Sequence, residues 1–464
     1  MKEPSENLND VMETDSSEER RLDRRKRRIR NQVIVYITAV ILLAGMVAGA
    51  NIGVQSLLDM LRTYQAANAN ASEPVIDIKE AEDIVEEVIV NAAPPEEEIA
   101  TEPEVEVEEE PVVELSVLDM IVENCIAELT LEEKIAALFI VTPELLTGAD
   151  NVTRAGDTTR EKLLAYPIGG LVYFSSNFSS ASQVREMLEN TRNMSKYPLF
   201  LAIDEEGGRV ARLASKNLAD NVGPMWNIGE TLDPQNAKEA GVKIATYLRG
   251  FGFNVNFAPV ADVIIDPENS PIGDRSFGTD AMMAAEMVKA FVQGAKEAEV
   301  HSTLKHFPGI GGTVTDTHVS MAITERSLEE MRGFEFLPFI AGIEAGVDLI
   351  MMSHVSSPNV TDDNTPASLS KKMITEILRG ELGYDGIVIT DAMNMGAITE
   401  YYTAADASVR ALQAGADMIL MPESFEEAYI GITEAVQSGK ITEERINESL
   451  RRIYRVKYAS QVAE

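Results

Sequence analysis

Short apolar runs of strand length recur along the chain from about residue 116 to the C-terminus. Nearly all neighbouring runs are separated by segments with a helical period of apolar positions, such as residues 237–252 and 284–300. Strands that alternate with helices pair in parallel, so eight such units predict an α/β fold, a (β/α)8 barrel of the TIM type. An open, doubly wound parallel sheet is the alternative. The predicted strands are residues 138–142, 170–174, 199–203, 254–258, 302–306, 348–352, 386–390 and 417–421.

Polar side chains end several of these predicted strands or follow them within a few residues. They are Asp204, Asp262, Lys305 with His306, His354 and Asp391. Catalytic residues of (β/α)8 barrels lie at the C-terminal ends of the strands. The pattern therefore predicts a catalytic site at that end of the barrel.

The first 115 residues have a different pattern. Residues 1–31 are polar and charged, which predicts a disordered cytoplasmic segment. Residues 32–57 contain an uncharged apolar run that is long enough to cross the roughly 30 Å hydrocarbon core of a bilayer, which predicts a signal anchor. Residues 58–115 form an acidic linker rich in proline and glutamate, and residues 116–464 form the catalytic barrel.

Eight basic residues between Arg20 and Arg30 precede the apolar run. The positive-inside rule therefore predicts a single-pass cell-membrane protein with a cytoplasmic N-terminus and an extracellular catalytic domain. Small residues at 48–50 leave a cleaved signal peptide, and hence secretion, as the alternative.

The formal net charge of −36 opposes binding to nucleic acid or to an anionic membrane surface. Much of this charge lies in the linker, because residues 74–115 contain sixteen acidic residues against the single Lys79. The only cysteine, Cys125, excludes an internal disulfide and lies in an apolar helical pattern, where it is expected to be a buried hydrophobe.

Two segments carry candidate chemistry. Asp391 ends a predicted strand, so its carboxylate could attack the anomeric carbon of a sugar, although an aspartate there could also cap a helix. The segment 305–318 passes through three glycines, which imply a mobile loop, and then reaches Asp316 and His318. An aspartate beside a histidine can orient the ring for proton exchange. A metal site that includes His306, or a purely structural histidine, is the alternative.

Two further segments combine acids with arginines. Residues 202–213 (AIDEEGGRVARL) and 272–278 (IGDRSFG) place carboxylates and guanidinium groups around glycine-rich turns. Such groups can bind sugar hydroxyls through charge-assisted hydrogen bonds. Loops held by salt bridges would look the same in sequence.

Read in order, IDEEGGRVARL, GFNVNFAPVADV, GDRSFG, KHFPG with DTH downstream, and GYDGIVITDAMNM resemble the motifs of glycoside hydrolase family 3. The resemblance covers about residues 116–457. The DTH element is similar to the Asp-Ser/Thr-His signature of the single-domain β-N-acetylglucosaminidase (β-N-acetylhexosaminidase) branch. Two positions depart from the family pattern: Ile310, where many relatives have histidine, and Ala392, where relatives often have an acid.

The resemblance implies roles for named residues. Asp391 would form a covalent glycosyl-enzyme intermediate, His318 would be the general acid and base, and Asp316 would orient His318. The implied sugar-binding residues are Asp204, Arg212, Arg275, Lys305 and His306. This chemistry uses only side chains and water, so no cofactor or metal is expected.

The expected function is that of a retaining exo-β-N-acetylglucosaminidase that releases terminal β-linked N-acetylglucosamine from peptidoglycan fragments or chito-oligosaccharides. A phosphorylase or another family 3 β-glycosidase is the nearest enzymatic alternative, since an uncharged histidine base would tolerate phosphate as the acceptor. A membrane-tethered cell-wall protein that only binds sugar is the non-enzymatic alternative.

Overall fold

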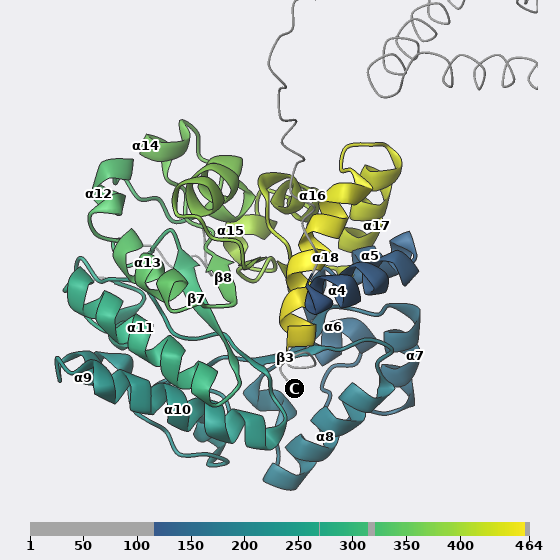
Figure 1. Ribbon diagram of the computed structural model, residues 1–464, viewed down its shortest axis with the longest axis horizontal. Helices are drawn as coiled ribbons and strands as arrows, with labels where there is room; N and C mark the ends of the chain where they lie inside the picture. The colour runs from purple at the N-terminus through teal and green to yellow at the C-terminus, as the bar shows by residue number, and fades with distance from the viewer. Residues whose placement is uncertain (1–115, 269, 314–320, 460–464) are drawn as a thin grey trace, which may run out of the picture. The chain divides into compact units, whose positions relative to one another are not determined.

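The computed structural model describes residues 116–268, 270–313 and 321–459 (Figure 1). Its main sheet has eight strands in the order β10-β1-β2-β3-β6-β7-β8-β9, and all neighbours are parallel. The strands are β1 Phe139–Val141, β2 Gly170–Tyr173, β3 Phe200–Ile203, β6 Val255–Asn256, β7 His301–Phe307, β8 Leu349–Met352, β9 Ile387–Thr390 and β10 Ile419–Leu420.

The two ends of this sheet meet. A parallel bridge between Ile389 of β9 and Met418, the residue before β10, joins the two end strands of the sheet. The Thr390 N–H also donates to the Met418 carbonyl at 3.1 Å. The sheet is therefore a nearly closed barrel of the predicted type rather than an open sheet. All eight predicted strands are present. Some are shorter than expected, and β6 ends before Pro259, which has no N–H to donate to a neighbour.

Helices surround the strands in Figure 1. They are α4 Val117–Glu128, α5 Leu131–Ala136, α6 Pro143–Thr147, α7 Asp157–Ala165, α8 Ala181–Met194, α9 Met225–Gly229, α10 Pro234–Phe251, α11 Ala281–Glu297, α12 Leu328–Arg332, α13 Phe336–Glu344, α14 Pro358–Thr361, α15 Gly396–Thr399, α16 Ala404–Ala414, α17 Phe425–Gln437 and α18 Glu443–Tyr458. A π-helical segment, η5, covers Lys372–Glu381.

The pair α10 and α11 illustrates how the sequence builds these helices. Asp233 and Asp280 cap their N-termini through side-chain oxygens that accept backbone N–H groups. The helices approach closely because a Cβ at Gly241 would lie 2.4 Å from the Phe291 carbonyl oxygen, and one at Gly294 would lie 2.2 Å from the Lys238 carbonyl oxygen. The glycines are therefore needed for the packing of two barrel helices.

A two-stranded antiparallel hairpin, β4 Glu205–Gly207 and β5 Val210–Ala211, follows β3 directly and was not expected from the apolar pattern. Its residues include the acids and glycines of the segment 202–213, which have no strand periodicity. The hairpin lies at the C-terminal end of β3, where the catalytic site is predicted.

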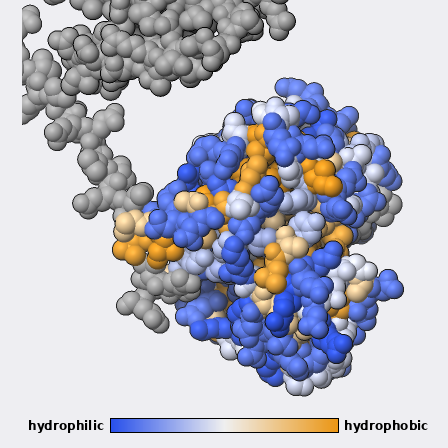
Figure 2. All heavy atoms as spheres, turned by 90° about the vertical axis from the view of Figure 1, so that its right-hand side faces the viewer, coloured by the Kyte–Doolittle hydropathy of each residue, from blue (hydrophilic) through white to orange (hydrophobic). Residues whose placement is uncertain are grey.

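Apolar side chains of the strands fill the barrel, and those of the helices pack against its outside. Hydrophilic residues cover most of the face of the described domain seen in Figure 2, with smaller hydrophobic patches between them. Cys125 is only half-buried on α4, with its Sγ 3.6 Å from the Tyr458 hydroxyl, so the expectation of a buried hydrophobe holds only in part.

The predicted cytoplasmic segment, signal anchor and acidic linker, residues 1–115, lie outside the described residues. Within residues 116–459, apart from the two undescribed gaps, no helix combines the length and apolar character needed to cross a bilayer.

Candidate active site

Asp391 lies at the C-terminal end of β9, at the predicted catalytic end of the barrel. Its N–H donates to the Met352 carbonyl at 2.8 Å, which fixes it against β8, and its Oδ1 accepts the Ala392 N–H at 2.8 Å. Burial alone would raise the pKa of the Asp391 carboxyl, but the imidazoles of His306 and His354 and the Ala392 amide outweigh burial and hold this pKa below its usual range. The carboxyl group is therefore ionised at neutral pH.

Side chains of alternating charge extend across this end of the barrel. The Lys305 Nζ lies 2.7 Å from Asp204 Oδ1 and 2.7 Å from Glu206 Oε1. Glu206 also accepts two hydrogen bonds from the Arg275 guanidinium, at 2.8 and 2.9 Å. Arg212 Nη2 lies 3.7 Å from Asp204 Oδ2 at the other end of the series. Four of the five predicted sugar-binding residues thus belong to one connected network.

The charges in this network keep one another ionised. Burial would lower the pKa of Lys305, but the carboxylates of Asp204 and Glu206 outweigh it and raise this pKa. Burial would likewise raise the pKa of Glu206, but Lys305 and Arg275 hold it well below its usual range. Paired buried charges of this kind avoid the cost of an unpaired ion.

His306, the fifth predicted sugar-binding residue, is held by Asp262. Its Nδ1 lies 2.7 Å from Asp262 Oδ2, and its Nε2 lies 3.5 Å from the Arg275 guanidinium. The Asp262 carboxylate can only accept, so the Nδ1 of His306 carries a proton. The other Asp262 oxygen accepts the Ile310 N–H at 2.8 Å.

His354 is buried at the end of β8. Its Nε2 lies 3.0 Å from the Ala392 carbonyl oxygen, which can only accept, so Nε2 carries the proton. Its Nδ1 lies 2.8 Å from the Ser368 hydroxyl, which can either donate or accept. His354 thus fixes the backbone of the residue that follows Asp391.

Three residues of this site had no individual role in the prediction from sequence: Glu206, Asp262 and His354. For Asp262 and His354 a signal existed, since both follow predicted strands. Glu206 lies inside the segment 202–213, but nothing in the local pattern distinguishes it from Glu205.

Asp316 and His318, the predicted acid/base pair, lie outside the described residues. The segment that leads to them is described as far as Thr313 and is firmly packed. A Cβ at Gly311 would lie 2.0 Å from the Val263 carbonyl oxygen, and the Ile265 N–H donates to the Gly311 carbonyl at 3.2 Å. Gly311 therefore serves a close backbone contact, whereas the predicted mobility of the loop that carries Asp316 and His318 concerns residues outside the described ranges.

Metal binding was the alternative considered for this segment. Among the described residues, no three histidine, cysteine, aspartate or glutamate side chains are grouped so that they could hold a metal ion. The combination of His306 with Asp316 and His318 includes undescribed residues and stays untested.

The family model "Glycosyl hydrolase family 3 N terminal domain" matches residues 130–456. A beta-hexosaminidase from Xylella fastidiosa (strain M23) is 38% identical over 269 residues, which cover 56% of this chain and 78% of that protein. Beta-hexosaminidase A from Pseudoalteromonas piscicida is 32% identical over 325 residues, which cover 64% of this chain and 54% of that protein.

Among solved structures, the chain is similar to a glycoside hydrolase family 3 beta-N-acetylglucosaminidase from Paenibacillus sp. str. FPU-7. The two share 36% sequence identity with a TM-score of 0.68, and the match covers 72% of this chain and 64% of the other. The chain thus spans only about half to two thirds of two of these relatives. Because the family model matches well over half of the chain, the chain belongs to glycosyl hydrolase family 3.

Proposed function

We propose that this protein is a retaining exo-β-N-acetylglucosaminidase that hydrolyses terminal β-linked N-acetylglucosamine by double displacement. The observation that carries the proposal is the ionised carboxylate of Asp391 at the end of β9, beside the network of Asp204, Lys305 and Glu206. The beta-hexosaminidase names of the relatives support the choice of sugar.

In the first step an oxygen of the Asp391 carboxylate attacks the anomeric carbon and forms a glycosyl ester, while the bond to the leaving oxygen breaks. His318 gives its proton to that oxygen. In the second step His318 takes a proton from water, the water oxygen attacks the anomeric carbon, and the Asp391 carboxylate leaves. Two inversions give net retention, and Asp316 orients His318 throughout.

The predicted sugar-binding residues would hold the hydroxyl and acetamido groups of the sugar. Asp204 has a side chain that is 16% exposed, whereas that of Glu206 is 1% exposed. Asp204 can therefore accept hydrogen bonds from a sugar while Glu206 serves to hold Lys305 and Arg275. Arg212, 30% exposed, supplies a guanidinium at the open end of the network.

The location that we propose for the enzyme rests on the sequence alone. We propose that residues 32–57 anchor it in the cytoplasmic membrane with the N-terminus inside, and that the acidic linker holds the barrel away from the membrane on the outer side. There it would act on peptidoglycan fragments or chito-oligosaccharides.

The first test is release of p-nitrophenol from p-nitrophenyl β-N-acetylglucosaminide and from the matching β-glucoside, with and without phosphate. We expect release from the acetamido sugar, loss of that release in Asp391→Asn and His318→Ala, and no loss in Asp385→Asn, a surface control. Proton NMR of the first-formed sugar should show the β anomer. A requirement for phosphate would replace hydrolysis by phosphorolysis, and no release from either sugar would favour a sugar-binding protein.

A further inference from the structure

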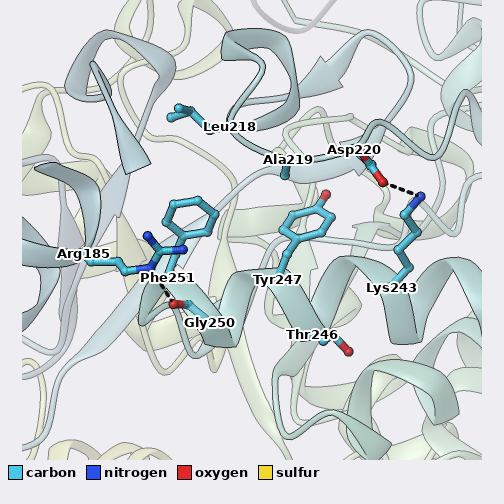
Figure 3. A pocket seen from close by; sticks show the side chains of 9 residues that line it. All are labelled: Arg185, Leu218, Ala219, Asp220, Lys243, Thr246, Tyr247, Gly250 and Phe251. Carbon is cyan, nitrogen blue, oxygen red and sulfur yellow. Dashed lines mark hydrogen bonds and ion pairs between the residues drawn. The ribbon is translucent and has the colours of Figure 1, made fainter. Parts of the chain in front are cut away.

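A groove of about 450 Å³ lies on the outside of the barrel, between α8, α10 and residues 218–220 (Figure 3). Tyr247 and Phe251 project into it from α10, between Arg185 on one side and the ion pair of Asp220 with Lys243 on the other. The groove contains none of the residues assigned to the candidate active site. It is connected to that site by one side chain, because the Tyr247 hydroxyl donates to Glu205 Oε1 at 3.1 Å.

Glu205 is completely buried directly after Asp204. Its backbone is fixed to β6, since its N–H donates to Asn256 Oδ1 at 2.9 Å and its carbonyl accepts from Asn256 Nδ2 at 2.9 Å. Its side chain extends in another direction and accepts the N–H groups of Leu213 at 2.8 Å and Ala214 at 3.1 Å. Glu205 therefore links the barrel wall to the backbone just after β5.

That backbone carries Arg212. The Arg212 guanidinium lies over the Phe174 ring, 5.3 Å from its centroid, and reaches Asp204 only at 3.7 Å. Its Nε is buried and has no hydrogen-bond partner among the described residues. With so few contacts of its own, the direction of this side chain depends on how the backbone of residues 212–214 is held.

We propose that Glu205 and Tyr247 are positioning residues that hold Arg212 in place for the sugar. This inference rests on the proposed function, because Arg212 is there a sugar-binding residue. The Tyr247 hydroxyl supplies the third hydrogen bond to the buried carboxylate and keeps its Oε1 directed toward Ala214. Burial raises the pKa of Glu205, while the backbone N–H groups and the tyrosine hydroxyl oppose that rise. Loss of the hydroxyl would leave the carboxylate with two of its three hydrogen bonds, those from Leu213 and Ala214.

The test uses Tyr247→Phe in the full chain, with Thr246→Ala as the matched control from the same helix and groove. Steady-state kinetics should show a KM for the acetamido sugar raised about tenfold in Tyr247→Phe with kcat changed less than about twofold, since the interaction binds substrate and transition state alike. In an Arg212→Ala background, Tyr247→Phe should raise KM no further. Glu205→Gln, which keeps the size of the side chain, should raise KM in the same direction.

A second readout needs no substrate. Amide hydrogen exchange at Leu213 and Ala214 should become faster in Tyr247→Phe and stay unchanged in Thr246→Ala. Unchanged exchange at these amides would overturn the proposal whatever the enzyme hydrolyses. An equal rise in KM with and without Arg212 would overturn it too, because Tyr247 would then act by another route. If the wild-type protein hydrolyses no β-N-acetylglucosaminide, the proposed function fails, and the exchange measurement alone decides whether Tyr247 holds the Arg212 backbone.

Discussion

The carboxylate of Glu206 lies 2.7 Å from the ammonium group of Lys305, and the two side chains are 1% and 3% exposed. Lys305 also contacts Asp204, and Glu206 also contacts Arg275. The Glu206–Lys305 pair therefore connects Asp204 with Arg275, two residues that are proposed to bind the sugar. Glu206 itself is too deeply buried to be a main sugar contact, so its effect on catalysis would pass through its neighbours Lys305 and Arg275.

Glu206→Gln removes the negative charge that lies between Lys305 and Arg275. Asp204 then remains as the carboxylate partner of Lys305 among the described residues. Breaking a buried ion pair from one side typically costs about 3–5 kcal/mol of folding free energy. We expect a loss in that range in denaturant unfolding and a kcat/KM lowered at least about 100-fold.

The control for this variant is Glu381→Gln. Glu381 makes the same two-pronged contact with Arg332, at 2.6 and 2.8 Å, but on the surface. Exposed pairs are worth about 0–1 kcal/mol, so the control should stay close to wild type in both stability and activity. Equal effects of the two substitutions would mean that burial of the Glu206 pair has no special consequence.

Asp262→Asn is expected to disturb His306. The two Asp262 oxygens face the Ile310 N–H and the His306 Nδ1–H, both donors, so an amide NH2 group must face a donor in either orientation. If the His306 ring changes tautomer instead, its new N–H faces the Arg275 guanidinium. We expect KM for the sugar to rise about 10- to 100-fold, measured by steady-state kinetics.

The opposite end of β7 offers a matched control. His301 Nδ1 lies 2.7 Å from Asp348 Oδ2, the same pair with the same distance at the N-terminal end of the strand. Residues at that end of a (β/α)8 barrel contribute to stability rather than to catalysis. Asp348→Asn should therefore leave KM unchanged, and a comparable rise in KM would contradict the assignment of Asp262.

Gly311→Ala tests why the segment before Asp316 is rich in glycine. The added methyl group would lie 2.0 Å from the Val263 carbonyl oxygen, which is backbone and lies next to Asp262, so one of the two segments must move. We expect a loss of about 1–3 kcal/mol in unfolding free energy, together with a raised KM. Gly250→Ala in α10, where a Cβ meets nothing within 4 Å, should instead be neutral or stabilising by up to about 1 kcal/mol. If glycine mainly served flexibility here, Gly311→Ala would alter kcat without lowering stability.

The fold could be predicted largely from the sequence, because most of the buried parallel strands are apolar runs and nearly all neighbouring runs are separated by a helical pattern. The strand ends in the sequence also predict that Asp204, Lys305, His306 and Asp391 lie at one end of the barrel. Their mutual contacts could not be predicted in the same way, since they join residues about a hundred positions apart, as Lys305 and Asp204 do.

The adjacent acids Glu205 and Glu206 show where sequence reasoning ends. Both are buried, yet Glu206 faces two cations and Glu205 faces backbone N–H groups and a tyrosine. Residues of the hairpin β4–β5 have no apolar alternation, so no period indicates which way each side chain points. Only the three-dimensional arrangement of β7, the 272–278 loop and α10 separates their roles.

The pH dependence of stability should separate these two acids. The folded pKa of Glu206 is lowered, because Lys305 and Arg275 outweigh burial, so its contribution is complete above the unfolded value of about 4.3 and is lost as pH falls below it. The stability difference between wild type and Glu206→Gln, measured by urea unfolding between pH 7 and pH 3, should therefore shrink below about pH 4.3 by up to about 1.4 kcal/mol per pH unit.

The folded pKa of Glu205 is raised by burial, so the sign is reversed for this residue: its contribution is greatest below the unfolded pKa and declines as pH rises toward the folded pKa. Relative to Glu205→Gln, wild type should thus lose stability as pH rises above about 4.3. Differences that do not change with pH, or that change in the same direction for both variants, would contradict the charge assignments. Opposite trends for two neighbours in the chain would follow only if one carboxylate is paired with cations and the other is not.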